Sequence, residues 1–492
     1  MYCENCGRKM VALVLAAAML VLVLAGCGNG KNGKNRFSSP EEYYRHVESA
    51  AMADSIERFE EGYDDALQLL FYDSGQKIEM ETTLELFKPA EDMLETYTGY
   101  DFSWLRTLGI AANMNLAEDG ALAELALSLN GRDLIGAEVL ADVAEGTLYG
   151  RVPLISKEYF QTDFDGASVR SGVLDVLKEM AGAIPDGKTM AGILTGCVEA
   201  ALEHVKNVKE GSDTLEAGGV SVKYTTLTVT LTEDELQDIA EDVCKLLKKD
   251  KDIEKYYLYL EEWGGTGIYD EFLNTLDELP DQIALDDDVV MTLYVDDDDV
   301  IHGRVIEYGD YILRNAMPEK DGKFALEMSL EDTDEDEVLW IIYGDGKRDG
   351  DTLEGAFTVE QNDTELFTIM LDRKDADGGM PIGTCTIRPT YEYYTLFGMY
   401  SLTARALEDF SYTLNVDKNK AVFEVYMDDE PFLALTVRAE SGPAEELPVI
   451  SGAEDINRWA QSLSRSLMSY LNYLKDSDLP PELLNQLLGN IF

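Results

Sequence analysis

Apolar and charged residues alternate along several segments of this 492-residue chain, and this alternation restricts its fold more than any other feature. In the segment 77–87, Ile78, Met80, Leu84 and Leu86 are separated by lysine, glutamate and threonine. In 121–129, every second residue is apolar. Because side chains of a strand point alternately to its two faces, period two with one charged side predicts half-buried strands of an antiparallel sheet.

The rest of the chain combines such strands with helices. Strands are expected near 134–142, 145–152, 284–296, 300–308, 323–330, 336–343, 352–361, 364–371, 381–388, 409–417, 420–427 and 431–438. Turn-forming residues closely separate the later strands, so they predict a meander rather than a βαβ array. Helices are expected over 40–70, 170–210, 232–249, 252–279 and 456–474. The fold class is therefore α+β, with curved antiparallel sheets and packing helices.

Two local patterns give sharper predictions. In Val220–Leu231, apolar residues occupy even positions up to Tyr224 and odd positions from Leu227, which predicts a bulge or bend at Thr225–Thr226. Capping boxes are expected where Ser39 precedes Glu42 and where Thr232 precedes Glu235.

The N-terminus has the pattern of a secretory signal. Arg8 and Lys9 precede an uncharged apolar run from Met10 to Leu24, which is shorter than the roughly 20 residues of a membrane span. The run ends in Leu24-Ala25-Gly26-Cys27, which resembles the lipobox of bacterial lipoproteins, in particular a broad group from Gram-positive anaerobes. The resemblance implies cleavage between Gly26 and Cys27 and attachment of a diacylglyceryl group, with a further acyl chain such as palmitate, to Cys27.

This interpretation predicts the domain organisation and the cellular location of the protein. We expect a signal peptide at 1–26, a flexible basic linker at 27–39, an α+β domain at 40–280 and a β-rich domain with a C-terminal helix at 281–492. The protein would be anchored to the cell membrane on its extracytoplasmic face. Both halves combine helices with a meander, so the sequence leaves open an internal duplication and whether the halves share one sheet.

The net charge of the chain restricts the classes of partner that it can bind. The chain carries 40 Lys plus Arg against 96 Asp plus Glu, a net charge of −56. Such a surface repels nucleic acid and anionic lipid headgroups, and it could attract a basic partner.

The metal-ligating residue types form no recognisable site. After Cys27 the cysteines are Cys197, Cys244 and Cys385, an odd number, so buried free thiols are expected for the first two, with a Cys197–Cys244 bridge left open. The three histidines, at 46, 204 and 302, lie in separate segments, and no zinc motif occurs, so we expect neither a metal site nor a cofactor. The acidic segment 296–307 has the length of a calcium loop but lacks its central glycine, and weak calcium binding by acidic loops stays open.

No catalytic signature stands out. Neither a nucleophile elbow nor a phosphate-binding loop occurs, and Gly265-Thr266-Gly267 is interpreted as a loop between helices. Paired carboxylates and a sugar-stacking platform stay open; the aromatic residues considered for the platform are Trp263, Trp340, Tyr391, Tyr393 and Tyr394. We therefore expect a non-enzymatic protein.

A second resemblance suggests a more specific role. The segments 147–154 (TLYGRVPL) and 157–160 (KEYF), together with the strand and capped helix of Val220–Leu247, are similar to lipoprotein-localisation factors and related lipid-binding lipoproteins. The resemblance implies a curved antiparallel sheet around helices and an apolar cavity. Three functions follow: an envelope or binding lipoprotein of unknown ligand, a carrier of lipid or another apolar ligand, and a carbohydrate-active hydrolase.

Overall fold

The computed structural model describes residues 37–70, 76–117, 119–143, 145–163, 182–264, 266–349, 352–374, 382–399, 405 and 407–484. The predicted signal peptide and the linker up to residue 36 lie outside these ranges. Residues 164–181, which include the first part of the helix predicted at 170–210, also lie outside them. The chain forms two compact units. Unit 1 comprises Met1–Ala66, Gly182–Pro381 and Pro389–Ala404, and unit 2 comprises Leu67–Ala181, Ile382–Arg388 and Arg405–Phe492.

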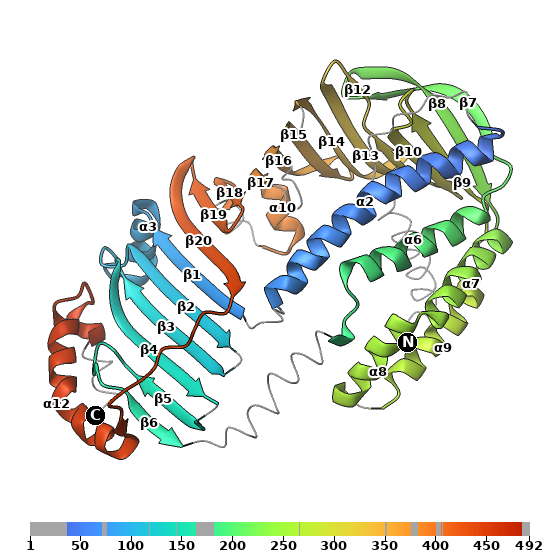
Figure 1. The fold of residues 1–492 in the computed structure, drawn as a ribbon. Helices are drawn as coiled ribbons and strands as arrows, with labels where there is room; N and C mark the ends of the chain where they lie inside the picture. Colours follow the sequence, from blue (N-terminus) through green and yellow to red (C-terminus); the bar gives the residue numbers. More distant parts are fainter. Residues whose placement is uncertain are drawn as a thin grey trace, which may run out of the picture. The chain divides into compact units, whose positions relative to one another are not determined.

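Unit 1 contains an antiparallel sheet (Figure 1). Its order is β7 (Lys209–Ala217), β8 (Val220–Leu231), β9 (Val289–Val295), β10 (Ile301–Tyr308), β11 (Tyr311–Ala316), β13 (Lys323–Asp332), β14 (Glu337–Asp349), β15 (Thr352–Gln361) and β16 (Thr364–Lys374), with the short β12 (Glu319–Lys320) beside β13. The helical elements are α2 (Pro40–Leu70), α6 (Gly187–Glu203), α7 (Glu233–Lys249), α8 (Lys251–Gly264), α9 (Ile268–Glu278), the 3-10 turn η2 (Pro280–Gln282) and α10 (Tyr391–Leu396).

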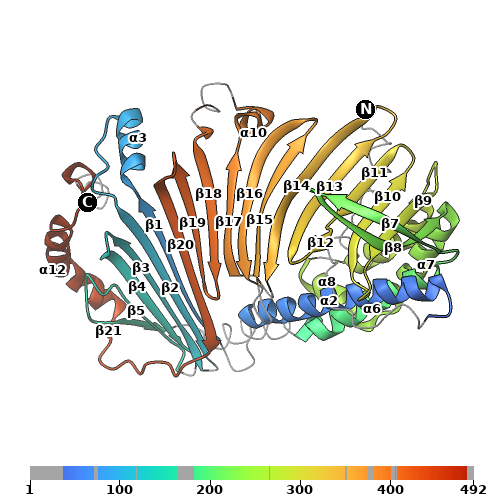
Figure 2. The ribbon, with the colours of Figure 1, turned by 90° about the horizontal axis from the view of Figure 1, so that it is seen from above.

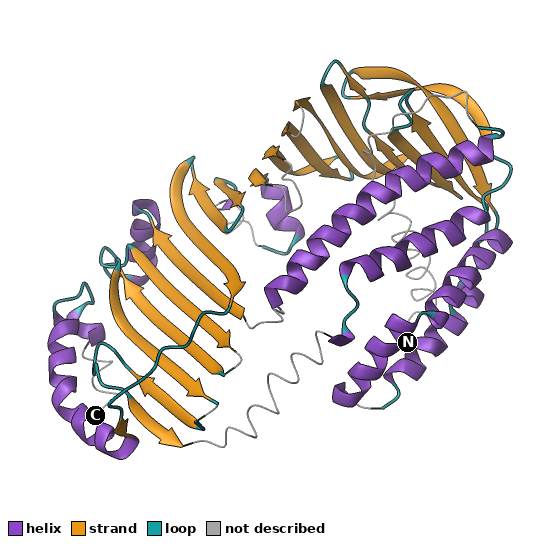
Figure 3. Ribbon diagram, viewed as in Figure 1, coloured by secondary structure: helices purple, strands orange, loops and turns teal. Residues whose placement is uncertain are grey.

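The strands of unit 2 form a curved sheet region, with helices at its margins (Figures 1 and 3). The order is β17 (Ile382–Pro389), β18 (Phe410–Asp417), β19 (Lys420–Met427), β20 (Glu430–Pro443), β1 (Gln76–Leu86), β2 (Thr107–Ala117), β3 (Gly120–Leu129), β4 (Arg132–Asp142), β5 (Thr147–Arg151) and β6 (Phe160–Asp163). The short β21 (Glu454–Asp455) pairs in parallel with β6, and all other pairs named here are antiparallel. The helices are α3 (Lys88–Thr98) and α12 (Ile456–Lys475).

The predicted class is confirmed: the protein is α+β, with curved antiparallel sheets built largely as meanders and helices packed against them. Every strand expected after residue 280 is present. The internal duplication stays a prediction. The units divide the chain differently from the expected boundary at 280/281, because β9 pairs with β8 in unit 1 and β20 pairs with β1 in unit 2.

Among the described strands, six were not expected from the sequence: β2, β6, β7, β11, β12 and β21. The sequence of β2, TLGIAANMNLA, alternates, but no charged residue marks its second face. The sequence of β7, KEGSDTLEA, is mostly polar. Both strands form beside neighbours that supply backbone partners, which a local pattern does not report.

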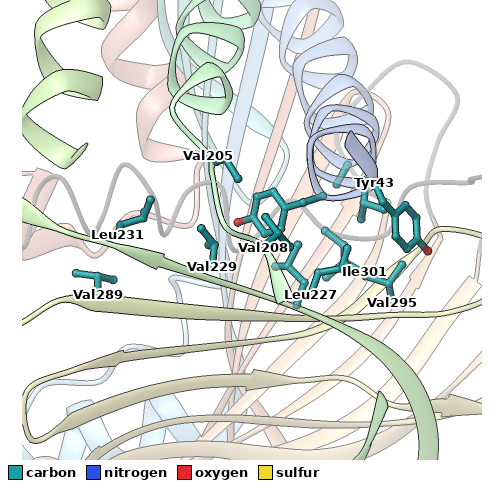
Figure 4. Close-up of a cluster of buried hydrophobic side chains, with 13 residues drawn as sticks. Tyr43, Val205, Val208, Leu227, Val229, Leu231, Val289, Val295 and Ile301 are labelled. Atoms are coloured by element: carbon teal, nitrogen blue, oxygen red, sulfur yellow. The ribbon is translucent and has the colours of Figure 1, made fainter. Parts of the chain in front are cut away.

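The principal core lies between α2 and the sheet of unit 1. Figure 4 shows Tyr43 of α2 near Leu227 of β8 and Val295 of β9, together with Val205 and Val208. Leu227, Leu293 and Val295 are completely buried. Helix α2 is therefore held on the sheet by its first turns.

The bulge predicted at Thr225–Thr226 is wrong. The register of β8 with β7 and with β9 runs through both residues without a shift. Tyr224 belongs to a second core cluster, whereas Leu227 belongs to the core beneath α2. The apolar phase changes because one face of the strand is covered in its first half and the other face in its second half.

The capping boxes differ in one detail. At α7, the Thr232 hydroxyl accepts a bond from the Glu235 amide at 3.3 Å and the Glu235 carboxylate accepts one from the Thr232 amide at 3.0 Å, as predicted. At α2, the Ser39 hydroxyl accepts from the Glu42 amide at 3.3 Å, but the Glu42 carboxylate accepts from the Ser38 amide at 2.8 Å. The reciprocal bond is thus displaced by one residue.

Candidate apolar binding face

One face of the sheet of unit 2 is uncharged except at one end, where Arg132 of β4 pairs across from Leu129 and donates to the Tyr473 backbone oxygen of α12. Residues that pair directly across neighbouring strands point to the same face, so the register defines its members. We call this set the apolar face: Gly383, Cys385 and Ile387 of β17; Tyr412, Leu414 and Val416 of β18; Ala421, Phe423 and Val425 of β19; Leu433, Leu435, Val437, Ala439 and Ser441 of β20; Gln76, Ile78, Met80, Thr82, Leu84 and Leu86 of β1; Leu108, Ile110, Ala112, Met114 and Leu116 of β2; Ala121, Ala123, Leu125, Leu127 and Leu129 of β3; Ile135, Ala137, Val139 and Ala141 of β4.

Much of the apolar face is open to solvent. The side chains exposed by 37–56% come from six of its strands: Met80, Ile110, Met114, Leu125, Ile135, Val139, Leu414 and Phe423. Scattered exposed apolar residues are ordinary, but a contiguous exposed patch spread over several strands marks a binding surface. The half-buried strand predicted at 77–87 is therefore present, with its apolar side still partly in contact with water.

The helices of unit 2 lie at the margins of this sheet. Helix α3 packs against β20, and α12 lies beside β6 and β21 (Figure 2). Tyr470 and Leu474 of α12 bury Leu129 at one end of the apolar face. Trp459 packs on Phe160 of β6, with ring centroids 4.8 Å apart. These contacts cover the end of the face and leave its middle strands exposed.

The opposite face of the same sheet is charged. It carries Lys77, Glu79, Glu81, Glu124 and Glu138 on neighbouring strands.

A cavity of about 280 Å³ lies on this charged face, lined partly by Ala111, Asn113, Glu124, Glu138 and Leu154. Two of its acids already have side-chain partners: Glu138 accepts two bonds from the Arg151 guanidinium, at 2.6 and 2.7 Å, and Glu124 accepts one from Asn113 at 3.1 Å. The cavity thus has the character of a structural polar network.

Tyr159 completes that network. Its hydroxyl donates to Glu138 at 2.6 Å, and its ring lies under the Arg151 guanidinium, 4.5 Å from the centroid. Burial, and then the bond to Glu138, raise the pKa of Tyr159 to about 12, so the phenol stays protonated at neutral pH. The segment 157–160, which the sequence analysis connected with lipid-binding lipoproteins, therefore lies at the β5–β6 margin of this sheet.

Two histidines that lie far apart in the sequence both contact aspartates of the loop between β9 and β10. His46 of α2 lies 3.7 Å from the Asp299 carboxylate, and His302 of β10 lies 3.0 Å from Asp296. The Tyr43 hydroxyl also donates to Asp299 at 2.9 Å. The acidic segment 296–307 therefore begins with the β9–β10 loop, and the aspartates of this loop bind it to α2 and β10.

His302 is held in place through both of its ring nitrogens. Its Nε2 faces the Asp296 carboxylate, and its Nδ1 faces the backbone oxygen of Met317 at 3.2 Å.

This loop gives a prediction for acid stability. Burial raises the pKa of Asp296, but hydrogen bonds from His302 and from the Val300 and Asp298 amides outweigh burial and lower it overall. A carboxylate with a lowered folded pKa stabilises the protein above its unfolded pKa, near 3.8, and this stabilisation is lost as the pH falls through the folded value. We expect Asp296→Asn to reduce the dependence of unfolding free energy on pH below about 4, measured by urea unfolding between pH 7 and pH 3. Asp298→Asn, at an exposed aspartate of the same loop, is the control, and an unchanged pH profile for Asp296→Asn would contradict the assignment.

The next candidate residues are the three cysteines that follow Cys27. Cys197, Cys244 and Cys385 are free thiols, and Cys244 is buried as expected, whereas Cys197 is only half-buried. Burial raises the pKa of each. Among the described residues, no group of three or more His, Cys, Asp or Glu side chains could hold a metal ion. Cys27 and Gly26 lie outside the described residues.

Three of the aromatic residues considered for sugar stacking, Tyr391, Tyr393 and Tyr394, belong to the short helix α10. Tyr393 packs edge-on against Phe367 and against Tyr394, which is buried. Trp340 lies in β14, and the side chain of Trp263 is not among those described. Gly267 caps α9 in a left-handed conformation, with φ 98°, at the end of the predicted interhelical loop.

Comparisons with known proteins add no relative. No protein-family model matches the chain, and no curated protein matches it. Within the described ranges, no helix has both the length and the apolarity needed to cross a bilayer.

Proposed function

We propose that this chain is an exported binding lipoprotein, tethered by an acylated Cys27, whose apolar face binds an apolar ligand. The observation that carries the proposal is the uncharged face that extends over eight adjacent strands, from β17 to β4, and leaves large apolar side chains exposed in six of them. Such a surface is stabilised when an apolar partner removes it from water.

Two further observations support this function. The lipobox at Leu24–Cys27 predicts a location next to a source of lipid. Glu124 and Glu138 of the polar cavity are occupied by Asn113, Arg151 and Tyr159, so this carboxylate pair does not favour the hydrolase alternative. We therefore place the activity in binding rather than in catalysis.

The anchor is tested by expression in a bacterial host with a lipoprotein pathway. We expect the unaltered chain to lose residues 1–26, gain acyl mass on Cys27 and fractionate with membranes. Cys27→Ala should remain unacylated, while Cys385→Ala, which removes a cysteine far along the chain, should behave as the unaltered protein. An unaltered protein that stays full length and soluble, without acyl mass, would refute the anchor.

Ligand binding is tested separately from the anchor. The chain from residue 28 to 492 contains every described residue and lacks the acyl site. After purification without detergent, its extract should contain lipid or another apolar compound by mass spectrometry. Recovery of none, together with failure to bind added lipid, would refute the binding role.

A further inference from the structure

The extent of the apolar face restricts the ligand that could fill it. One continuous row crosses the sheet with one residue from each of seven adjacent strands: Cys385, Leu414, Phe423, Leu435, Leu84, Leu108 and Leu129. Six strand spacings of about 4.8 Å make this row about 29 Å wide. Along β1, the six-residue step from Ile78 to Leu84 adds roughly 20 Å in the other direction.

A single acyl chain covers only a small part of such a surface. The hydrocarbon core of a bilayer is about 30 Å thick and holds two chains end to end, so one chain is about 15 Å long. The exposed side chains lie at both sides of the face, with Leu414 and Phe423 on β18 and β19 and with Leu125 and Ile135 on β3 and β4. A ligand that covers both groups needs more than one chain.

Charge restricts the rest of the ligand. The named members of the apolar face are uncharged, and Arg132, which pairs across from Leu129 at its end, already donates to the backbone oxygens of Tyr473 and Asp476. The chain as a whole carries a net charge of −56. The opposite side of the same strands adds Glu79, Glu81 and Glu124. An anionic head group would gain no partner on the face and would be repelled by the surrounding acids.

Resting on the proposed binding role, we infer that the apolar face takes a lipid with at least two acyl chains and no net negative charge. The chains lie on the exposed side chains of β18–β4, and the uncharged head group faces solvent. Burial of this face by one multi-chain molecule accounts for both its width and its lack of charge.

Cys385 provides a built-in reporter, because it stands at the end of the row and is half-buried. The experiment uses residues 28–492 and measures maleimide labelling by peptide mass spectrometry, with Cys197 and Cys244 of unit 1 as internal controls. Leu414→Cys adds a more exposed reporter on the neighbouring strand. The probes are dioleoylglycerol, monooleoylglycerol and dioleoyl phosphatidic acid, added at equal acyl-chain concentration.

We expect dioleoylglycerol to slow labelling at 385 and 414 at least tenfold, and monooleoylglycerol and phosphatidic acid to slow it less than threefold. The labelling of Cys197 and Cys244 should not change. Glu81→Gln, on the charged face, should leave the protection intact.

Each other outcome has a definite meaning. Equal protection by monooleoylglycerol would overturn the requirement for two chains, and equal protection by phosphatidic acid would overturn the charge requirement, while both results would leave the binding role standing. Protection by none of the lipids would refute the binding role itself. A lipid-free dimer in sedimentation analysis that already protects both thiols would show that a second copy covers the face.

Discussion

Arg304→Met should lower the free energy of unfolding by about 3–5 kcal/mol, because it leaves a buried carboxylate without its cation. Arg304 of β10 and Glu48 of α2 are both almost fully buried, and the guanidinium donates to the two carboxylate oxygens at 2.5 and 2.6 Å. Tyr44 lies beside the pair, and burial raises its pKa well above the usual value, so it remains a neutral neighbour. The ion pair therefore fastens α2 to the sheet of unit 1.

Urea unfolding of residues 28–492 measures the loss, and hydrogen exchange in the first turns of α2 localises it. The matched control is the double variant Glu48→Leu/Arg304→Met, which removes both charges and should lose much less stability than the single variant. Arg438→Met provides a second control, because Arg438 pairs with Glu81 at the surface. A loss of less than about 1 kcal/mol for Arg304→Met would contradict the role of the pair.

Leu125→Glu should weaken binding of an apolar ligand at least a hundredfold, the second of the two largest effects. Leu125 is 56% exposed and lies midway along β3, toward one side of the apolar face, so a glutamate is hydrated in the free protein. Bound ligand would remove that carboxylate from water without a partner, at a cost of several kcal/mol. Titration of residues 28–492 with a fluorescent naphthylamine probe measures the change.

The control for this prediction is the same substitution elsewhere. Leu194→Glu changes an exposed leucine of α6 in unit 1, and we expect the affinity for the probe to remain within twofold of the unaltered protein. Circular dichroism and urea unfolding establish that both variants are folded. Undiminished binding by Leu125→Glu would move the ligand site away from the apolar face.

Local sequence patterns were sufficient for many individual elements. The alternation in 77–87 predicted β1, and the pair Thr232 and Glu235 predicted the start of α7. These signals depend on neighbouring residues, since a strand shows its two faces at period two and a cap satisfies the first amides of its own helix. Strands with no charged residue on either face, such as β2, gave a weaker signal.

The meeting of distant residues could not be predicted in this way. Asp299 meets Tyr43 of α2, and Glu48 meets Arg304, each pair 256 residues apart along the chain. A lone histidine such as His302 likewise gave no sign that it would lie between Asp296 and the Met317 carbonyl. A zinc motif would have been visible from its spacing, but a single buried ion pair has no spacing rule.

By itself, the sequence determined which side chains share a face, where many strands and helices form, and that the class is α+β. Only the tertiary structure decided which apolar faces are covered: Leu227 and Val229 of β8 are buried under α2, whereas Met80 of β1 and Leu125 of β3 remain exposed. The physical reason is that alternation records the two sides of a strand, while burial depends on whether a remote segment packs there. That difference separates a core of unit 1 from the proposed binding face of unit 2.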